Sequence, residues 1–200
     1  MRIVMQVYMA NSSMKKAAVF IIYVLVIAWQ GCTKEHNTSP SNLPNGDFEG
    51  WTVNDKLQAW KTNSCPECYP AFNSYVVQKT TEAYHGQYAA KLIFNGVYSA
   101  VASDLFAVAS HPMLLSGYTK CTLDEHDTVF VKVQVFSNRA VVDSGQWVNT
   151  VSIPMYKQFI VPITQSSTHA DSVLITVRGG NKMSAGSNGS VLWIDYLSIH

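Results

Sequence analysis

The stretch Thr128–Phe136 reads TVFVKVQVF and carries the clearest structural signal in the chain. Every second residue is valine, at Val129, Val131, Val133 and Val135. A period of two is that of a β-strand, so the pattern predicts a strand that buries its valine face. Further short runs with β-branched residues follow the same logic: Tyr88–Phe94, Ser99–Val108, Met113–Lys120, Arg139–Asp143, Tyr156–Ile163, Ser172–Arg178 and Val191–Ile199. With no convincing amphipathic helix from residue 45 onward, the sequence predicts an all-β sandwich or barrel.

The turn-forming residues and prolines around these runs support the same fold class. Glycine-rich turns are expected at Ser144–Gly145, at Gly179–Asn181 and along Gly186–Gly189. Pro154 and Pro162 flank or enter one run, and because proline removes a ladder donor, that strand is expected at a sheet edge.

Composition excludes one class of partner. The chain of 200 residues holds 14 Lys and Arg against 13 Asp and Glu, a formal net charge of +1. This balance gives no basic footprint for nucleic acid. Only 14% of residues are charged while 12% are aromatic, which favours strands.

The N-terminal segment predicts export. Lys15 and Lys16 precede the apolar run Ala17–Trp29, which is too short to span a bilayer comfortably and is typical of a secretory signal. Gly31 and Cys32 end this run and resemble a lipobox, although Trp29 and Gln30 depart from its usual pattern. Residues 1–31 are therefore expected to be a signal peptide whose true start is possible at Met14, with Cys32 lipidated. The alternative is a plain signal peptide or an uncleaved anchor.

Residues 32–44 follow as the lipidated cysteine and a polar, Pro- and Ser-rich tether, and residues 45–200 form the β-sandwich domain. We expect an exported lipoprotein, held by its lipid in the outer membrane on the periplasmic face or the cell surface.

Several segments resemble known modules in order along 45–200. Asn45–Glu49 (NGDFE), Ala83–Leu92 and Leu192–Ile199 resemble carbohydrate-binding modules. Ala59–Asn63 and Leu115–Lys120 resemble a carbohydrate metabolism domain of bacterial surface lipoproteins. The resemblance implies a two-sheet jelly roll of the galactose-binding-like kind and a polysaccharide or oligosaccharide partner.

The same resemblance implies a structural calcium ion. In the modules it is held where the opening and closing motifs meet, which corresponds to the carboxylates of Glu49 and Asp195 and to carbonyls near Asp47 and His85. Carboxylates and carbonyls are the oxygen ligands that calcium prefers. The position after Asp195, often a second acid, is Tyr196. The alternative is that Glu49 and Asp195 hydrogen-bond main-chain groups without a metal.

The four cysteines divide into one for lipid and three in the domain. Cys65 and Cys68 form a C-x-x-C without a second pair for zinc or a βαβ context for redox chemistry, so a loop disulfide between them is predicted. Cys121 pairing with either one is the alternative.

Exposed aromatic side chains are the usual platforms for sugars. We predict Trp147, in a loop over Gly145–Asn149, together with Tyr69 and Tyr98, as ligand-binding candidates. Structural roles are expected for Trp51 and Trp60, and a core position for Trp193.

The acidic cluster Asp124–Asp127 is the densest group of polar side chains and is expected to be a solvated turn. No catalytic motif accompanies it. The sequence thus favours a non-catalytic glycan-binding lipoprotein that assists polysaccharide capture. A structural or adhesive lipoprotein that binds protein partners is the second hypothesis, and a glycan-acting hydrolase the third.

Overall fold

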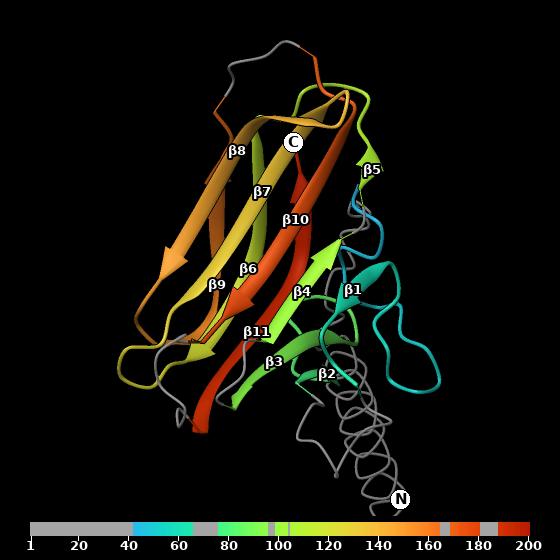
Figure 1. The fold of residues 1–200 in the computed structure, drawn as a ribbon. Coiled ribbons are helices and arrows are strands. Elements are labelled where there is room, and N and C mark those ends of the chain that lie inside the picture. Colours follow the sequence, from blue (N-terminus) through green and yellow to red (C-terminus); the bar gives the residue numbers. More distant parts are fainter. Residues whose placement is uncertain (1–41, 66–75, 96–98, 104, 165–168, 181–187) are drawn as a thin grey trace, which may run out of the picture. The chain divides into compact units, whose positions relative to one another are not determined.

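A computed structural model describes residues 42–65, 76–95, 99–103, 105–164, 169–180 and 188–200. Their regular structure is all strand, in two antiparallel sheets (Figure 1). Within these ranges there is no helix that could cross a membrane.

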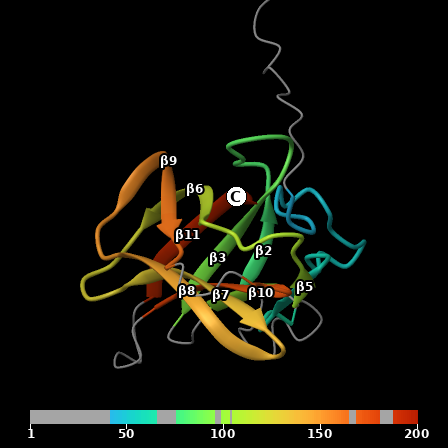
Figure 2. The same cartoon turned by 90° about the horizontal axis from the view of Figure 1, so that it is seen from above.

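The described strands are as follows: β1 Trp60–Thr62, β2 Val77–Thr80, β3 Ala89–Asn95, β4 Ser99–Ser103, β5 Phe106–Ala107, β6 Leu114–Thr122, β7 Val129–Ser137, β8 Ala140–Asn149, β9 Ile153–Pro162, β10 Ser172–Gly179 and β11 Asn188–Ile199. One sheet has the order β1-β4-β10-β7-β8, with β5 also pairing with β10. The other has the order β2-β3-β11-β6-β9. Figure 2 shows them as two stacked layers, the β-sandwich jelly roll that the sequence predicts.

The core forms where the two layers face each other. Val129, Val131, Val133 and Val135 are all at most 1% exposed, which confirms the predicted valine face of β7. Leu192 and Ile194 of β11 are fully buried in the same cluster from the opposite sheet. The sheets approach closely at Gly179, where an added Cβ would lie 1.9 Å from the Phe94 ring.

The predicted strand boundaries were wrong in β8. We expected a strand ending at Asp143, a turn at Ser144–Gly145 and a loop carrying Trp147. Instead β8 continues to Asn149, with Gly145 paired to Val133 of β7. Gly145 serves close packing here, because an added Cβ would lie 2.2 Å from the Pro162 carbonyl oxygen across the sandwich.

Other boundaries differ less. The run Ser99–Val108 divides into β4 and β5, and the short strands β1 and β2 had no clear pattern of their own. The proline argument is confirmed, since β9, which holds Pro154 and Pro162, lies at a sheet edge.

Candidate functional site

The edge strands β8 and β9 lie on different sheets and are in contact along one side of the sandwich, which we call the seam (Figure 1). The seam is closed at one end, where Gly145 allows β8 to approach Pro162. There the Thr164 N–H also donates to the Ser144 carbonyl, at 3.3 Å. Further along, a ring contact between the two strands and the turn between Asn149 and Ile153 join them.

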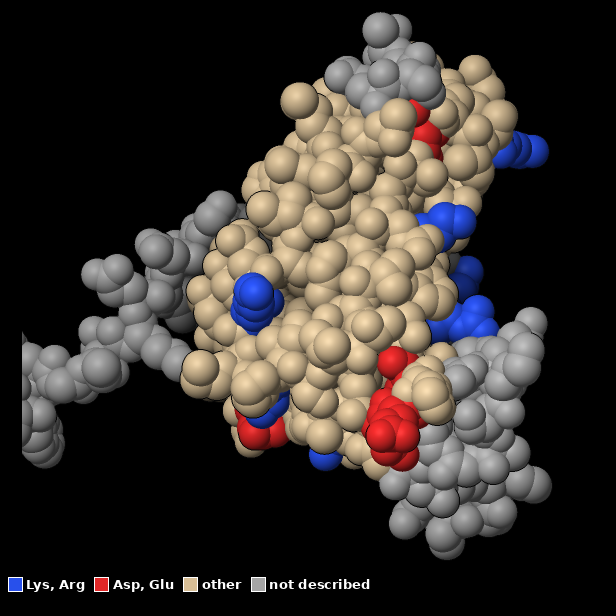
Figure 3. All heavy atoms as spheres, turned by 90° about the vertical axis from the view of Figure 1, so that its left-hand side faces the viewer, with Lys and Arg blue, Asp and Glu red and all other residues tan. Residues whose placement is uncertain are grey.

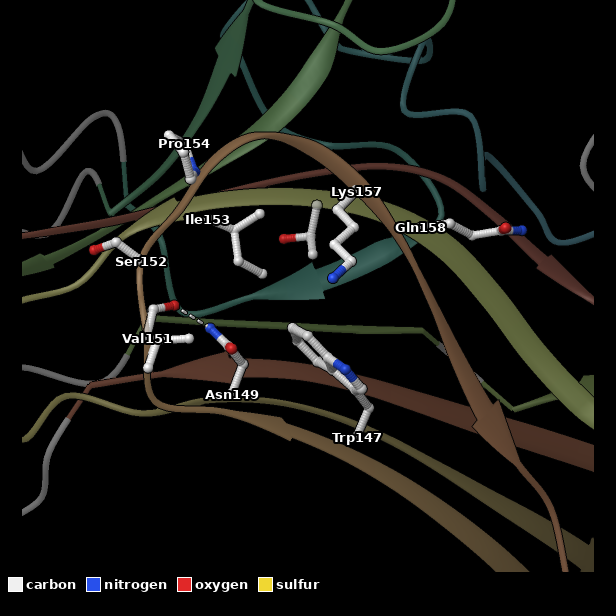
Figure 4. Close-up of a pocket in the computed structure, with 9 residues that line it drawn as sticks. Trp147, Asn149, Val151, Ser152, Ile153, Pro154, Lys157 and Gln158 are labelled. Atoms are coloured by element: carbon white, nitrogen blue, oxygen red, sulfur yellow. Dashed lines mark hydrogen bonds between the residues drawn. The ribbon is translucent and has the colours of Figure 1, made fainter.

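Trp147 lies along the seam. Its ring stacks on Phe159 of β9, with ring centres 5.1 Å apart. Beyond this stack is a hollow of about 360 Å³ (Figure 4). Its lining comprises Thr119, Trp147, Asn149, Val151, Ser152, Ile153, Pro154, Lys157 and Gln158. Trp147 is therefore half-buried on a rigid strand with its ring beside a cavity, although the sequence placed it in a loop.

Most polar groups of the hollow are already used to shape it. The Asn149 amide donates to the Val151 carbonyl, at 2.5 Å, and fixes the turn. Thr119 donates to the Trp193 carbonyl, at 2.9 Å. Ser152 accepts from the Leu123 N–H, at 2.9 Å. These bonds hold the turn and floor of the hollow in place.

Three side-chain donors in the lining have no partner among the described residues: the Lys157 ammonium group, the Trp147 indole N–H and the Gln158 amide. Figure 4 shows the Lys157 side chain extending across the hollow toward Trp147, whereas Gln158 lies apart. Lys157 is the one charged side chain in the lining. Figure 3 views this side of the molecule, where uncharged residues dominate, with an acidic group at the lower right and basic groups along the right edge and at the left. The hollow thus offers an aromatic ring and unused donors in a weakly charged setting.

A second aromatic group covers the outer face of the sheet that contains β11. Trp193 lies between two ammonium groups, with Lys120 Nζ 4.4 Å and Lys91 Nζ 5.5 Å from its ring. The predicted core position of Trp193 is wrong, because position 193 has the opposite parity to buried Leu192 and Ile194. Tyr84 and Tyr118 stack on each other nearby, with ring centres 3.5 Å apart. These flat faces are already engaged within the protein.

The opening and closing motifs do meet, at what we call the carboxylate latch: Glu49, Asp195 and the loop 84–88. Asp195 is fully buried, and its Oδ2 accepts from the N–H groups of Tyr84 and His85, at 2.7 and 2.9 Å. Its Oδ1 accepts from the Tyr196 N–H, at 2.7 Å. Tyr196 has φ 50°, beside the register shift between Asp195 and Ser198. The irregular backbone of β11 thus folds around this carboxylate.

Glu49 completes the latch from the opening motif. Its Oε1 accepts from the N–H groups of Gln87 and Tyr88, at 2.6 and 3.0 Å. Gly86 lies between the two sets of donors with φ +67°, and an added Cβ would lie 1.9 Å from Glu49 Oε1. Both carboxylates are thus fastened to one turn through main-chain donors. Asp47 Oδ1 is 3.5 Å from the Glu49 N–H, at the edge of hydrogen-bonding distance.

The carboxylate latch has only part of what a calcium ion needs. Glu49 Oε2 receives no donor from the described residues, and it is available as a ligand. Within the described ranges, however, no three His, Cys, Asp or Glu side chains converge as a metal site. An ion there would take its remaining ligands from carbonyls and water.

Burial shifts the titration of Asp195. Loss of hydration, with a smaller contribution from the nearby charge of Glu49, raises its pKa to about 7, although the three main-chain hydrogen bonds act in the opposite direction. The carboxylate latch is therefore a place where ionisation and folding are coupled.

The other predicted site residues fall into two groups. Cys32, Cys68, Tyr69 and Tyr98 lie outside the described residues. Cys65 is disulfide-bonded, and Cys121 is a buried free thiol, which removes the alternative in which Cys121 pairs. The Cys65–Cys68 pairing stays a prediction.

The acidic turn is only partly solvated. Asp124, Glu125 and His126 are exposed as predicted, but Asp127, just before β7, is 1% exposed. Sequence inspection also missed a buried pair, in which His111 Nε2 lies 2.7 Å from Asp143 Oδ2. Their side chains are 2% and 1% exposed, so this pair ties β8 to the segment before β6 and is closed to a substrate. Nothing in the local sequence links two residues so far apart.

Comparison with known proteins identifies the fold. No family model matches the chain, and no curated protein does either. Among solved structures, a family 61 carbohydrate-binding module in complex with β-1,4-galactotriose is 13% identical, with a TM-score of 0.50 over 81% of this chain and 99% of that one. A structure of carbohydrate-binding modules from the β-sandwich superfamily is 12% identical, with a TM-score of 0.52 over 80% of this chain and 62% of that one. The enzymatically active domain of tailspike protein 4 from bacteriophage CBA120 is 10% identical, with a TM-score of 0.53 over 80% of this chain but 21% of that one. The chain shares the β-sandwich fold of these structures.

Proposed function

We propose that the protein is a non-catalytic glycan-binding lipoprotein that assists polysaccharide capture, and that a sugar ring binds in the hollow beside Trp147. The observation that carries this proposal is the half-buried indole at the mouth of a cavity with unused hydrogen-bond donors. Sugar rings stack their C–H faces on flat aromatic rings, and polar groups around the ring then take the hydroxyls.

Pre-organisation supports the same site. Trp147 is held by the β8 ladder and by Phe159, and the turn beside it is fixed by the Asn149 hydrogen bond. A platform that does not have to be ordered on binding loses less conformational entropy. The fold is shared with carbohydrate-binding modules, one of them solved with a galactotriose, although at this level of identity the likeness concerns the fold alone.

A glycan panel tests the proposal. The full chain, solubilised in a neutral detergent, would be run by affinity gel electrophoresis against plant, algal and host polysaccharides. We expect at least one glycan to retard the protein, Trp147→Ala to abolish the retardation, and Trp147→Phe to keep part of it.

Trp193→Ala is the matched control, since it removes an indole of the other aromatic group. Thermal melts of each variant show that it is folded. A blank panel, or equal loss in both alanine variants, would refute the site. The exposed Val151 and Met155 beside the seam, 64% and 77% exposed, would then favour the adhesive, protein-binding alternative.

We further propose that a lipid on Cys32 anchors the domain in the outer membrane through the tether of residues 32–44. A binding module without its own catalytic groups is useful only where the captured polymer is needed, and the sequence before the domain supplies signal, cysteine and spacer. Labelled palmitate should be incorporated by the full chain and not by Cys32→Ser. Incorporation that persists in the serine variant would overturn the assignment.

Calcium at the carboxylate latch is a separate proposal. Glu49, Asp195 and carbonyls near Asp47 and His85 would hold the ion, which when bound would neutralise the two carboxylates fastened to the loop 84–88. Addition of calcium to chelator-treated protein should raise the melting temperature, and Glu49→Gln should remove that rise. An unchanged midpoint, with no calcium by elemental analysis, would refute it.

A further inference from the structure

The charge of the hollow indicates which glycans it takes. Lys157 is its one charged lining residue, and no carboxylate lines it. Two other lysines do have an acidic partner: Lys79 contacts Asp55 at 3.0 Å, and Lys120 contacts Glu82 at 2.7 Å. Lys157 has neither an ion pair nor a hydrogen bond within the described part of the chain.

The position of Lys157 is fixed by the sheet. It pairs with Thr119 of β6, and the register shifts between Thr119 and Cys121, where β9 is irregular. Phe159 follows two residues later on the same face of β9, and its ring stacks on that of Trp147. The ammonium group and the indole are therefore presented to the same hollow from facing strands, as Figure 4 shows.

The two groups that face each other across the hollow are both donors. The ammonium group and the indole N–H both donate, and the Asn149 amide nitrogen is already bonded to Val151 and Cys121. A neutral sugar hydroxyl uses one such donor, whereas an anionic oxygen on the ring gains both a hydrogen bond and charge neutralisation. A hollow with a cation and no acid discriminates in favour of the anion.

We infer that the hollow selects an acidic polysaccharide, with a sugar stacked on Trp147 and its carboxylate or sulfate group paired with Lys157. This inference rests on the proposed glycan-binding function and adds the substrate class. We expect one anionic group to be bound for each sugar ring in the hollow, because the lining carries one cation.

Matched pairs of polymers test it with the full chain in a neutral detergent. Polygalacturonate would be compared with its methyl ester, and dextran sulfate with dextran, by affinity gel electrophoresis. The wild-type protein should bind at least one acidic polymer up to about fivefold more tightly than its neutral partner, which is the upper size expected of one solvent-exposed ion pair. Retardation by polygalacturonate alone identifies a carboxylate, and retardation by dextran sulfate alone identifies a sulfate.

Variants of Lys157 separate this pairing from general electrostatic attraction. Lys157→Met should reduce binding of the acidic polymer to the level of the neutral one, and Lys157→Arg should keep most of it. Lys132→Met, which removes the same charge from β7, where Lys132 pairs with Thr176, is the control and should change nothing. Lys157 is exposed, so its substitution does not threaten the fold.

The outcomes distinguish the two proposals. Binding of neutral polymers alone, or acidic binding that survives Lys157→Met, overturns the inference and leaves glycan binding in place. The absence of binding to any polymer in the full panel overturns the proposed function together with it.

Discussion

The carboxylate latch and the Trp147 hollow use polar side chains in opposite ways. In the latch, five main-chain N–H groups converge on two carboxylates, and Asp195 is fully buried. In the hollow, the ammonium group of Lys157 and the indole N–H of Trp147 keep their hydrogen-bonding capacity unused among the described residues. Groups that are paired in the free protein stabilise the fold, whereas unpaired ones are available to a ligand. Substitutions should therefore affect stability in the first region and binding in the second.

Removal of the Asp195 carboxylate should have the largest effect. Asp195→Ala leaves three main-chain donors without their acceptor in a buried place, which should lower the free energy of unfolding by about 4 kcal/mol. Urea denaturation measures this. Lys157→Met is the contrast and should change stability by less than about 0.5 kcal/mol. A loss below about 1 kcal/mol in Asp195→Ala would show that water replaces the carboxylate.

Substitution of Gly86 should have the second largest effect on stability. Gly86→Ala places a Cβ where it collides with Glu49 Oε1, at a φ of +67° that other residues rarely adopt. We expect a loss of about 3 kcal/mol, measured by the same denaturation. Gly189→Ala is the control, because an added Cβ there meets nothing within 4 Å. Equal losses in both variants would remove the special role of the turn.

Trp147 should contribute less to stability than to binding. Its ring is half-buried on Phe159, so Trp147→Ala should cost about 2 kcal/mol, roughly half the value for a fully buried aromatic side chain. Trp147→Phe should keep most of the stacking and lose less. A loss as large as that in Asp195→Ala would make Trp147 a core residue and weaken the comparison.

The last prediction concerns pH, where the change over one pH unit is the smallest step of the series. The pKa of Asp195 is raised from 3.8 to about 7 in the folded protein, so the folded state holds its proton more tightly than the unfolded state. In chelator-treated protein this group should therefore stabilise the fold most below pH 4, and the contribution should be lost as the pH rises from 4 to 7, at up to about 1.4 kcal/mol per pH unit. Asp195→Asn should flatten that slope. A wild-type stability that rises over this interval, with Asp195→Asn unchanged, would contradict the shift.

Several features followed from the sequence because they are local. The alternating valines of β7 have only one way to be buried, and the prolines of β9 cannot sit in the middle of a sheet. The two motifs of the carboxylate latch were recognisable as motifs. Main-chain hydrogen bonds of Glu49 and Asp195 were given as the alternative to a metal, but their donors could not be named, since they lie in a third segment on main-chain groups that any residue carries.

The sequence predicted only some of the residues that line the hollow. Trp147 was identified as a candidate aromatic side chain, but in a loop, since Ser144–Gly145 has the composition of a turn. Its strand position follows from pairing with β7 and from close packing at Gly145. Lys157 was not singled out, because a lone lysine on a strand carries no local signal.

The sequence by itself determined that this chain is built from β-strands, because the two-residue hydrophobic period is a local property of each strand, and the resemblance of its motifs implied the two-sheet jelly roll. Only the tertiary structure decided which aromatic ring is free. Trp147 and Trp193 both lie on strands, yet one opens on a cavity between edge strands and the other lies between two lysines. Strand identity depends on neighbours in sequence, whereas the availability of a side chain depends on which distant strands pack against it.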